Sequence, residues 1–595
     1  MILRFPAGTS SVLHGIHCPH RHRALAVHWP GPLLEIKLSA TETPQTAVSE
    51  TERLDFDRRP TDFIHWKLNV EGDIATLAMD VQEDQGLKDH YVLKLNSYDL
   101  SVDMELAAAI QYLRFSHPEV RCLVLTGNLD RVFCAGANII MLRTSTHAFK
   151  VNFCKFTNET RLYLEEASAN SGLKTLAALN GTASGGGYEL ALACDRILLV
   201  DDRNSAVSHP EVPLLGVLPG TGGLTRMVDK RKIRRDLADV FNTTAEGVKG
   251  KRAVTWNLVD AVAPLSKFGD AVTTNARELA DASPALDAGQ GLDLERMQPQ
   301  FTDSGFHYQS VDVAVDNSAR KAAITITLPE AAGPSNADEA FAAGSDWWIF
   351  RTFRELDDAL LHLRLEYLDV GLLTLRVVGD PQVVLDTDVV LESGREHWFV
   401  REVSLLIKRA LKRLDVMSRS VYAIVDEGTA FAGTMLELAL AGDRVYLLND
   451  PDVPVTMGVS AMNGGAYPMG NGLSRLESHF YGTPDQVGVV LEHKGLFDSE
   501  TADDLGLATV APDDLDWEDD LRIALEERVS FSPDGLTGLE ANLRFCGPET
   551  METKIFGRLS AWQNWIFQRP NAVGERGALK CYGTPNRPEF DWSRT

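Results

Sequence analysis

The sequence predicts an α/β fold that occurs twice in the chain and is followed by a helical C-terminal region. Three observations support this prediction. Segments of the first half recur about 250 residues later, short β-branched strands alternate with amphipathic helices in both copies, and the pattern turns helical after about residue 516. Alternating strands and helices are typical of sheets whose strands are largely parallel. We therefore expect two α/β units of similar topology.

The recurring segments keep their order along the chain. A strand at residues 74–80 and a helix at 105–114 return 250 residues later, at 324–330 and 355–364. The segment 189–196 returns 248 residues later at 437–444, and the proline-bounded segment 210–213 returns at 451–454. Four matches in the same order indicate an internal duplication.

Composition divides the chain into five parts. We expect a poorly ordered N-terminal extension at 1–58, the first copy at 59–280, a linker at 281–306, the second copy at 307–515 and the helical region at 516–595. Gly, Pro, Ser and Ala are frequent in the linker. The helical region contains an apolar cluster, Trp562, Trp565, Ile566 and Phe567. For this cluster a helix docked on the core is favoured over a lid above the substrate.

Charge and cysteine usage narrow the functional classes. The 595 residues carry a net charge of −26, which argues against a broad nucleic-acid footprint. No stretch approaches the roughly 20 apolar residues that span a bilayer. The seven cysteines include no Cys-x-x-Cys pair, and Cys122 and Cys194 lie in apolar runs. We therefore expect reduced thiols and a cytoplasmic protein.

Five histidines lie in the first 38 residues, close to Cys18: His14, His17, His20, His22 and His28. A metal-binding tract is one interpretation of this cluster. No second group of ligands supports it, and an extension outside the fold is favoured. We expect no metal site.

Two loops with small residues carry the candidate chemistry. The segment 132–138, Val-Phe-Cys-Ala-Gly-Ala-Asn, follows a strand and precedes a helix expected near Ile139. The segment 180–195 follows another strand and places three glycines before a helix, with Gly186 at its N-terminus. The first backbone N–H groups of a helix have no internal acceptor. Two such amides that converge on one carbonyl oxygen form an oxyanion hole.

Two glutamates stand close to these loops in the sequence. Glu189 falls in the first turn of the helix after the glycines, where the helix dipole favours an anion, and Glu211 follows 22 residues later on a proline-bounded loop. Two carboxyls in one partly dry site are driven to different pKa values, so that one acts as base and the other as acid. The alternative is that Glu211 is a surface residue and Glu189 a helix-dipole partner.

The two loops and the segment 210–223, Pro-Glu-Val-Pro-Leu-Leu-Gly-Val-Leu-Pro-Gly-Thr-Gly-Gly, resemble the crotonase, or enoyl-CoA hydratase/isomerase, superfamily. The resemblance implies a crotonase-like ββα spiral fold, duplicated into a catalytic N-terminal copy and a degenerate C-terminal copy. It also implies that the amides of Ala137 and Gly186 bind a thioester oxygen and stabilise an enolate. The catalytic carboxylates are then Glu189 and Glu211, and the presence of both favours chemistry that involves water.

The runs 93–99 and 147–160, with the duplicated layout, resemble a branch of this superfamily that opens the epoxidised ring of benzoyl-CoA. This similarity spans about residues 45–595. It implies that two waters are consumed, that formate and 3,4-didehydroadipyl-CoA semialdehyde are released, and that no metal or redox cofactor takes part. The alternatives are an enoyl-CoA hydratase or isomerase acting on another acyl-CoA, and a non-catalytic relative that binds a CoA thioester or RNA.

Candidates for holding the CoA moiety are Lys94, Ala135 and Asn138. Lys94 lies beside the segment along which the family lays CoA. The basic run 230–235 is expected on an exposed helix face that is solvated or contacts another subunit. We expect an acyl-CoA substrate, no nucleic-acid or membrane partner, and a homodimer.

The second copy keeps Glu437 and has Asp452 in the place of Glu211. Its glycine triplet has become Gly433-Thr434-Met435, and residues 391–396 stand where the first loop would recur. Met435 removes the close backbone approach that glycine permits. We therefore expect a structural pseudo-copy without a matched pair of donors. Whether residues 463–465 reach the first site stays open.

Overall fold

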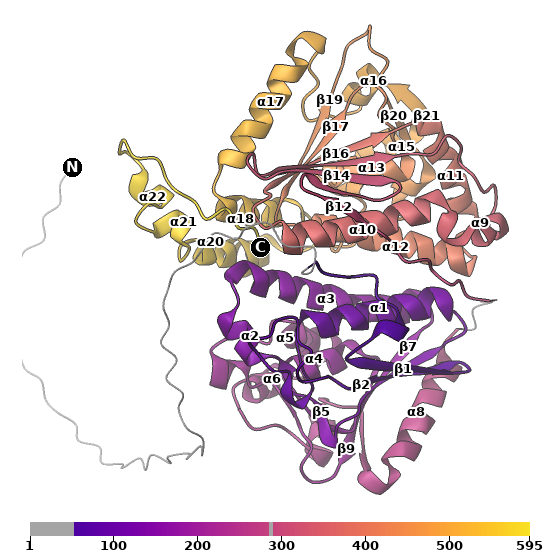
Figure 1. Cartoon of the computed structure of the whole chain (residues 1–595), viewed down its shortest axis with the longest axis vertical. Coiled ribbons are helices and arrows are strands. Elements are labelled where there is room, and N and C mark those ends of the chain that lie inside the picture. The colour runs from indigo at the N-terminus through magenta and orange to yellow at the C-terminus, as the bar shows by residue number, and fades with distance from the viewer. Residues whose placement is uncertain (1–52, 285–289) are drawn as a thin grey trace, which may run out of the picture. The chain divides into compact units, whose positions relative to one another are not determined.

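The centre of the first half is a six-stranded sheet (Figure 1) in the order β1-β2-β4-β7-β9-β11. The computed structural model of the chain describes residues 53–284 and 290–595. The strands are β1 (Trp66–Glu71), β2 (Ile74–Met79), β4 (Cys122–Gly127), β7 (Lys174–Leu179), β9 (Arg196–Asp201) and β11 (Ala261–Pro264). Only β1 and β2 pair antiparallel. The central strands are apolar and buried, as expected for parallel strands covered on both faces.

Short strands beside this sheet hold the candidate loops. A three-stranded parallel sheet is formed by β10 (Val207–Ser208), β8 (Gly181–Ser184) and β5 (Arg131–Cys134), and a two-stranded one by β3 (Ser97–Tyr98) and β6 (Gly136–Ala137). The helices are α1 (Leu100–Ser116), α2 (Ile139–Thr144), α3 (His147–Asn170), α4 (Gly186–Ala193), α5 (Gly223–Thr225), α6 (Arg235–Asn242), α7 (Gly250–Thr255) and α8 (Phe268–Ala282). The turns are η2 (Pro60–Asp62), η3 (Lys94–Asn96), η4 (Glu211–Leu215), η5 (Arg226–Lys230) and η6 (Leu265–Lys267).

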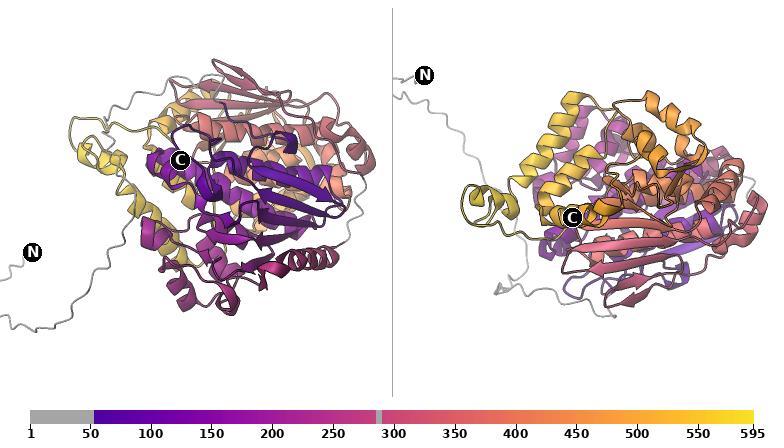
Figure 2. Two further views of the ribbon diagram at one scale, coloured as in Figure 1. Left: turned by 60° about the horizontal axis from the view of Figure 1, so that its bottom comes forward. Right: turned by 90° about the horizontal axis from the view of Figure 1, so that it is seen from above.

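The second half repeats this plan around a seven-stranded sheet. Its strands, in spatial order, are β12 (Gln300–Thr302), β13 (Gly305–His307), β14 (Val311–Asp316), β15 (Lys321–Thr327), β16 (Leu372–Val378), β17 (Ser420–Val425) and β19 (Arg444–Leu447). A smaller sheet contains β18 (Phe431–Ala432), β20 (Thr456–Val459) and β21 (Gly495–Asp498). The helices and turns are α9 (Ala337–Ala343), η7 (Gly344–Asp346), α10 (Trp348–Glu366), α11 (Pro381–Ser393), α12 (Trp398–Asp415), α13 (Gly433–Leu440), η8 (Ala461–Gly464), α14 (Arg475–His479), α15 (Asp485–Glu492) and α16 (Ser499–Asp504). Figure 2 shows from two further sides that each half keeps its own sheet.

Two boundaries differ from those expected from composition. Residues 300–306, assigned to the linker, form β12 and start β13, so the second half begins earlier. Residues 53–58, assigned to the extension, contact the second half: Arg53 pairs with Glu366 at 3.0 Å, and the backbone N–H of Leu54 donates to the same carboxylate. The histidine tract and Cys18 lie outside the described residues.

The two halves meet through helices (Figure 1): α1 and α3 of the first face α10 and α12 of the second. Buried ion pairs cross this interface. Arg114 donates to Glu402 at 2.7 Å, and Glu159 accepts from Arg364 at 2.7 Å and from Arg413 at 2.5 Å. Removing one partner of such a buried pair typically costs about 3–5 kcal/mol. These pairs therefore fix the register of the four helices.

The C-terminal region consists of α17 (Asp514–Ser530), α18 (Pro533–Leu543), α19 (Met551–Lys554), η9 (Ile555–Leu559), α20 (Ser560–Ile566), α21 (Pro570–Val573) and α22 (Ala578–Cys581). Helix α20 packs on α18, where Ile566 and Trp562 approach Gly538. Trp565 stacks on His147 at the start of α3, with ring centroids 5.6 Å apart. These contacts hold α20 against α18 and the start of α3, while Phe567 stays 55% exposed, so the docked-helix interpretation stays a prediction.

Within the described residues, no helix combines the length and apolarity needed to cross a bilayer. The same part of the chain holds no group of three His, Cys, Asp or Glu side chains arranged to bind a metal ion.

Candidate active site

The two predicted loops touch each other. Strand β6 pairs with β3, and the N–H of Asn138 donates to the carbonyl of Tyr98 at 2.8 Å. Successive N–H groups of a strand point to opposite edges, so the N–H of Ala137 faces away from β3. Gly136 has φ +92°, and a Cβ on it would lie 3.0 Å from the amide nitrogen of Gly186. Glycine is thus required at position 136 for this approach.

Helix α4 begins at Gly186, as predicted. Gly185 precedes it with φ +53°, and its carbonyl accepts from the N–H groups of Tyr188 and Glu189. The amides of Gly186 and Gly187 come before the first intrahelical donor and have no acceptor within the helix. The N-terminus of α4 therefore presents free donors beside the loop of Ala137.

The Glu189 carboxylate is held in one position. Its side chain is 3% exposed, Oε2 accepts from Thr221 Oγ1 at 2.5 Å, and Oε1 accepts from the N–H of Gly223 at 2.8 Å. A Cβ on Gly223 would lie 2.6 Å from the Cγ of Glu189. The glycines and threonine after residue 219 therefore form a close cradle for this carboxylate, a role that the loop motifs alone did not reveal.

Glu211 lies next to the same helix end. It begins the turn η4 and is 8% exposed, and a Cβ on Gly185 would lie 2.6 Å from its Oε1. No described residue offers a hydrogen bond to its Oε2. Burial raises the pKa of Glu211 to about 7, and the nearby charge of Glu189 adds to this rise. The structure thus brings the two predicted glutamates together in different environments.

A buried histidine, His209, lies close to Glu189 on the other side of Gly223. Asn242 donates through Nδ2 to the carbonyl of Ala238, so its Oδ1 accepts from His209 Nδ1, which therefore carries the proton. Burial lowers the pKa of His209, and its Nε2 has no partner among the described residues. Its Cε1 and the Cγ of Glu189 flank Gly223. The sequence signal for this residue is its place directly before Pro210.

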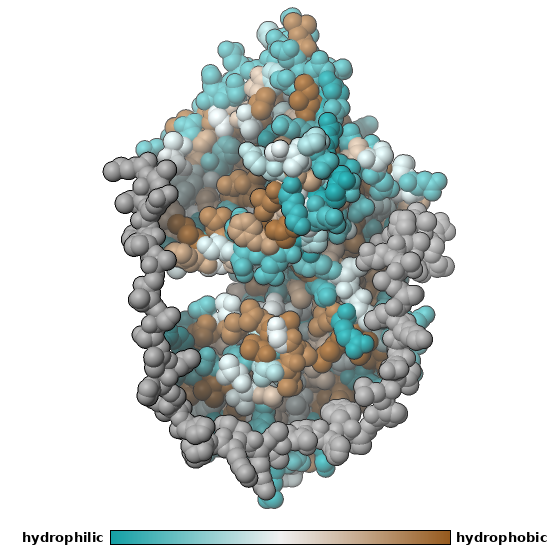
Figure 3. Space-filling model, turned by 90° about the vertical axis from the view of Figure 1, so that its left-hand side faces the viewer, coloured by the Kyte–Doolittle hydropathy of each residue, from teal (hydrophilic) through white to brown (hydrophobic). Residues whose placement is uncertain are grey.

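Apolar side chains are exposed beside Glu211. Figure 3 looks onto the side where α2 lies and shows apolar surface gathered on the first half. Eight apolar residues of α2 and of the segment 212–224 are 37–66% exposed: Ile139, Ile140, Val212, Leu214, Leu215, Val217, Leu218 and Leu224. Contiguous exposed apolar surface of this kind marks binding sites for ligands or proteins.

The three CoA candidates lie on the edge of this site. Lys94 opens η3 and is exposed, and Ala135, also exposed, donates its N–H to the carbonyl of Leu95. Asn138 is buried: its Oδ1 caps α2 by accepting from the N–H of Met141, and its Nδ2 donates to the carbonyl of Val92 and to Ser97 Oγ. A contact of Asn138 with CoA would therefore use its backbone, and all three assignments stay predictions.

The basic run 230–235 was wrongly expected on one exposed helix face. It spans the end of η5, a turn and the start of α6. Lys230 pairs with Glu165 at 2.9 Å, and Arg231 is buried against Asp260 at 2.9 Å. The chain bends here, because Lys232 takes φ +54°, so the charges point in different directions.

The second half fills its own helix terminus. Thr434 occupies the place of Gly186, and its N–H donates at 2.9 Å to Asp388, a buried residue of α11. The same carboxylate accepts from Ser460 Oγ at 2.6 Å. The expectation that this half lacks a matched pair of donors therefore gains a physical reason: a carboxylate of the chain occupies the remaining amide.

Two further positions of the second half, Asp452 and Asn463, also differ from what a second or shared active site would need. Asp452, expected in the place of Glu211, is exposed. Asn463 donates to Glu437 at 2.8 Å and to the carbonyl of Gly433, so it serves the second half rather than the first site.

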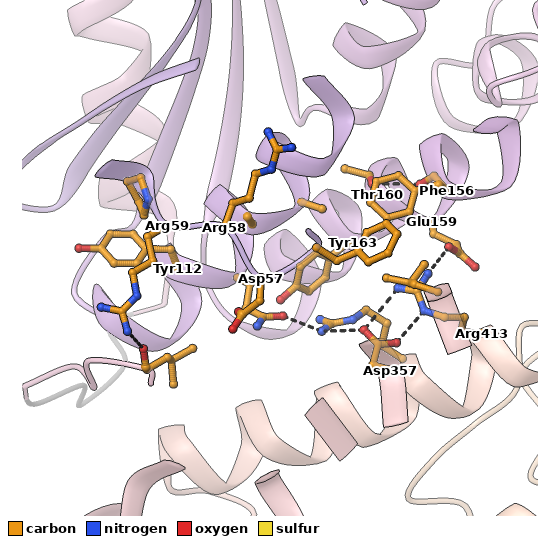
Figure 4. A pocket seen from close by; sticks show the side chains of 18 of the residues that line it. Asp57, Arg58, Arg59, Tyr112, Phe156, Glu159, Thr160, Tyr163, Asp357 and Arg413 are labelled. Atoms are coloured by element: carbon orange, nitrogen blue, oxygen red, sulfur yellow. Dashed lines mark hydrogen bonds and ion pairs between the residues drawn. The ribbon is translucent and has the colours of Figure 1, made fainter. Parts of the chain in front are cut away.

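A cavity of about 220 Å³ lies between the halves, away from the two glutamates. Figure 4 shows Arg413 held between Asp357 and Glu159 on its wall. Arg58 pairs with Glu105 at 3.2 Å and Arg59 with Asp293 at 3.5 Å. The arginines on the wall of this cavity already pair with carboxylates of the chain. We therefore interpret the space as part of the interface between the halves and not as a ligand site.

Comparison with known proteins agrees with this geometry. Residues 92–292 match the family model described as enoyl-CoA hydratase/isomerase. Over 544 residues the chain is 54% identical to the benzoyl-CoA-dihydrodiol lyase of Aromatoleum evansii, which covers 91% of this chain and 98% of that protein. The chain belongs to the crotonase (enoyl-CoA hydratase/isomerase) superfamily.

Other members of the crotonase superfamily match about a third of the chain. The mitochondrial methylglutaconyl-CoA hydratase of Rattus norvegicus is 30% identical over 185 residues, which is 31% of this chain and 56% of that protein. The crystal structure of the enoyl-CoA hydratase from Geobacillus kaustophilus has 32% identity and a TM-score of 0.32, and covers 37% of this chain and 75% of that one. The family match over residues 92–292 and the mostly parallel sheet of the first half confirm the crotonase-like α/β fold predicted from the two loops.

Proposed function

We propose that the chain opens the ring of 2,3-epoxy-2,3-dihydrobenzoyl-CoA with two waters, in aerobic benzoate degradation through CoA thioesters. The products are 3,4-didehydroadipyl-CoA semialdehyde and formate, so the enzyme is a carbon–carbon lyase. The observation that carries this proposal is the pair of buried carboxyls, Glu189 and Glu211, at the N-terminus of α4. The 54% identity to the Aromatoleum evansii lyase supports the choice of substrate.

The thioester oxygen would lie between the amides of Ala137 and Gly186. These donors stabilise the negative charge that develops as water adds, and each such donor typically contributes about 3–4 kcal/mol. They cost no reorganisation, because Gly136 and Gly185 already hold both loops in contact.

The two carboxyls divide the proton transfers. Glu189 accepts hydrogen bonds from Thr221 and Gly223, an arrangement that suits a carboxylate acting as general base toward water. Glu211 has a pKa raised to about 7 and carries its proton below that pH. Glu211 is therefore the general acid. It protonates the oxygen or carbon atom that is released as a ring bond breaks. These steps need neither a metal nor a redox cofactor, and CoA enters as part of the substrate.

Formate release tests the proposal directly. The purified chain is incubated with 2,3-epoxybenzoyl-CoA and, separately, with crotonyl-CoA. Formate from the first substrate and no hydration of the second is the expected result. Hydration of crotonyl-CoA without formate would assign the chain to the enoyl-CoA hydratases instead. Residence in the cytoplasm and a homodimer remain proposals, the latter tested by light scattering.

A further inference from the structure

The hydroxyl of Tyr98, next to the oxyanion loops, has no hydrogen-bond partner among the described residues. Tyr98 is 2% exposed, and no described residue shares a hydrogen bond with its Oη. The hydroxyl lies against Gly186, since a Cβ on this residue would lie 1.9 Å from Oη. The middle glycine of the triplet is therefore required to make room for this hydroxyl.

The ring of Tyr98 is held from behind. Phe153 packs on it with ring centroids 6.0 Å apart, and the guanidinium of Arg161 lies 5.4 Å from the ring centroid. Arg161 is itself fixed by Asp103 at 2.9 Å. A ring held in this way keeps its hydroxyl in place without a hydrogen bond.

Tyr98 also contacts the other donor residue. It is the register partner of Ala137 in the β3–β6 pair, and its carbonyl accepts from the N–H of Asn138. Tyr98 thus touches both residues whose amides form the oxyanion hole, through its backbone on one side and its hydroxyl on the other.

The second half offers an internal comparison. Trp348 stands 250 residues after Tyr98, and its Nε1 donates to Thr387 at 3.0 Å. In that half Thr434 stands in the place of Gly186, and the N–H of Thr434 donates a hydrogen bond to Asp388. The half whose amide is occupied therefore has neither the free hydroxyl nor the glycine that makes room for it.

We propose that Tyr98 is a catalytic residue whose hydroxyl is a third donor to the thioester oxygen, beside the amides of Ala137 and Gly186. This rests on the proposed function, which places that oxygen between the two amides. Burial raises the pKa of Tyr98, so the phenol stays protonated and donates. The hydrogen bond strengthens as negative charge develops on the oxygen, which favours the transition state over the bound substrate.

The test combines Tyr98→Phe with a probe of the carbonyl. Bound [carbonyl-13C]benzoyl-CoA reports through its 13C shift and C=O stretch how strongly the oxygen is polarised. We expect Tyr98→Phe to reduce this polarisation, to lower kcat for formate release about 10²–10³-fold, and to change the Kd of benzoyl-CoA less than threefold. Tyr163→Phe is the matched control, because Tyr163 is also buried with an unpartnered hydroxyl but lines the cavity between the halves.

An unchanged carbonyl signal in Tyr98→Phe would overturn the inference, even if kcat fell. Loss of benzoyl-CoA binding by more than tenfold would also count against it, because a structural role would then explain the defect. Replacing Tyr98 by 3-fluorotyrosine, a more acidic phenol of similar shape, should increase the polarisation and guards against misfolding of the Phe variant. The carbonyl signal is measured on bound benzoyl-CoA and needs no turnover. A wild-type chain that releases no formate would therefore refute the proposed function, while the effect of Tyr98→Phe on the carbonyl could still be measured.

Discussion

Glutamine at position 211 should make the chain inactive and, above neutral pH, more stable. The fold raises the pKa of Glu211 from its ordinary 4.5 to about 7, mainly through burial. Folding therefore favours the protonated carboxyl. The resulting penalty is absent below pH 4.5, grows as the pH rises, and is complete above pH 7. One pKa unit corresponds to about 1.36 kcal/mol, so the shift costs about 3 kcal/mol at alkaline pH, of which about 2.5 kcal/mol appears between pH 5 and pH 8.5.

Thermal unfolding at these two pH values measures the effect. For a unit of about 200 residues, 2.5 kcal/mol corresponds to roughly 5–10 °C. The Tm of Glu211→Gln minus that of the wild type should rise by this amount from pH 5 to pH 8.5, while formate release is lost. Glu246→Gln, an exposed substitution in the same half, controls for charge and should show no such trend. A Tm difference that does not change with pH would refute the assignment of Glu211 as the group whose ionisation the fold opposes.

Three further outcomes are expected. Formate release should fall as the pH rises above about 7, because Glu211 then loses the proton it donates; a rate that keeps rising through pH 8.5 contradicts this. Glu189→Gln should lower kcat by at least 10²-fold, with benzoyl-CoA binding retained by calorimetry; near-normal turnover removes Glu189 from the mechanism. Asp388→Ala should lower the stability of the second half by about 1–3 kcal/mol, because the N–H of Thr434 and the hydroxyl of Ser460 then lose their acceptor. Formate release below the unfolding temperature should survive in that variant, and its loss would show that the second half takes part in chemistry.

The loop chemistry of the first half was predictable because it is local. Gly136 and Gly186 are required by approaches of about 3 Å or less, and such requirements leave a fixed residue type in the sequence. The spacing after the glycines predicted that Glu189 lies in the first turn of α4, and the resemblance to the crotonase superfamily gave it a catalytic role. The repeat of strand and helix patterns at a spacing of 248–250 residues likewise reports local structure, so two α/β halves could be predicted without coordinates.

What the sequence left open depends on contacts between distant segments. Thr221 holds Glu189 from 32 residues away, and Tyr98 meets Gly186 from 88 residues away, through strands whose pairing no periodicity reveals. Asp388 lies on a helix that has replaced the first loop, so comparing loops position by position could not find it. The prediction for the basic run 230–235 was wrong for a related reason, because it assumed helical spacing across a segment that contains a turn.

The second half contributes to the first site by holding α3. Helix α3 carries Glu159 on the face toward the second half, where Arg364 and Arg413 bind it, and carries Arg161 two residues later, behind the ring of Tyr98. Successive positions of a helix face different sides, so one helix can be anchored on the second half and support the site at once. A crotonase-like unit without the duplication would have to anchor α3 in another way. The occupied amide at Thr434 fits this division of labour, because a half that acts as support gains from a closed, fully bonded helix end.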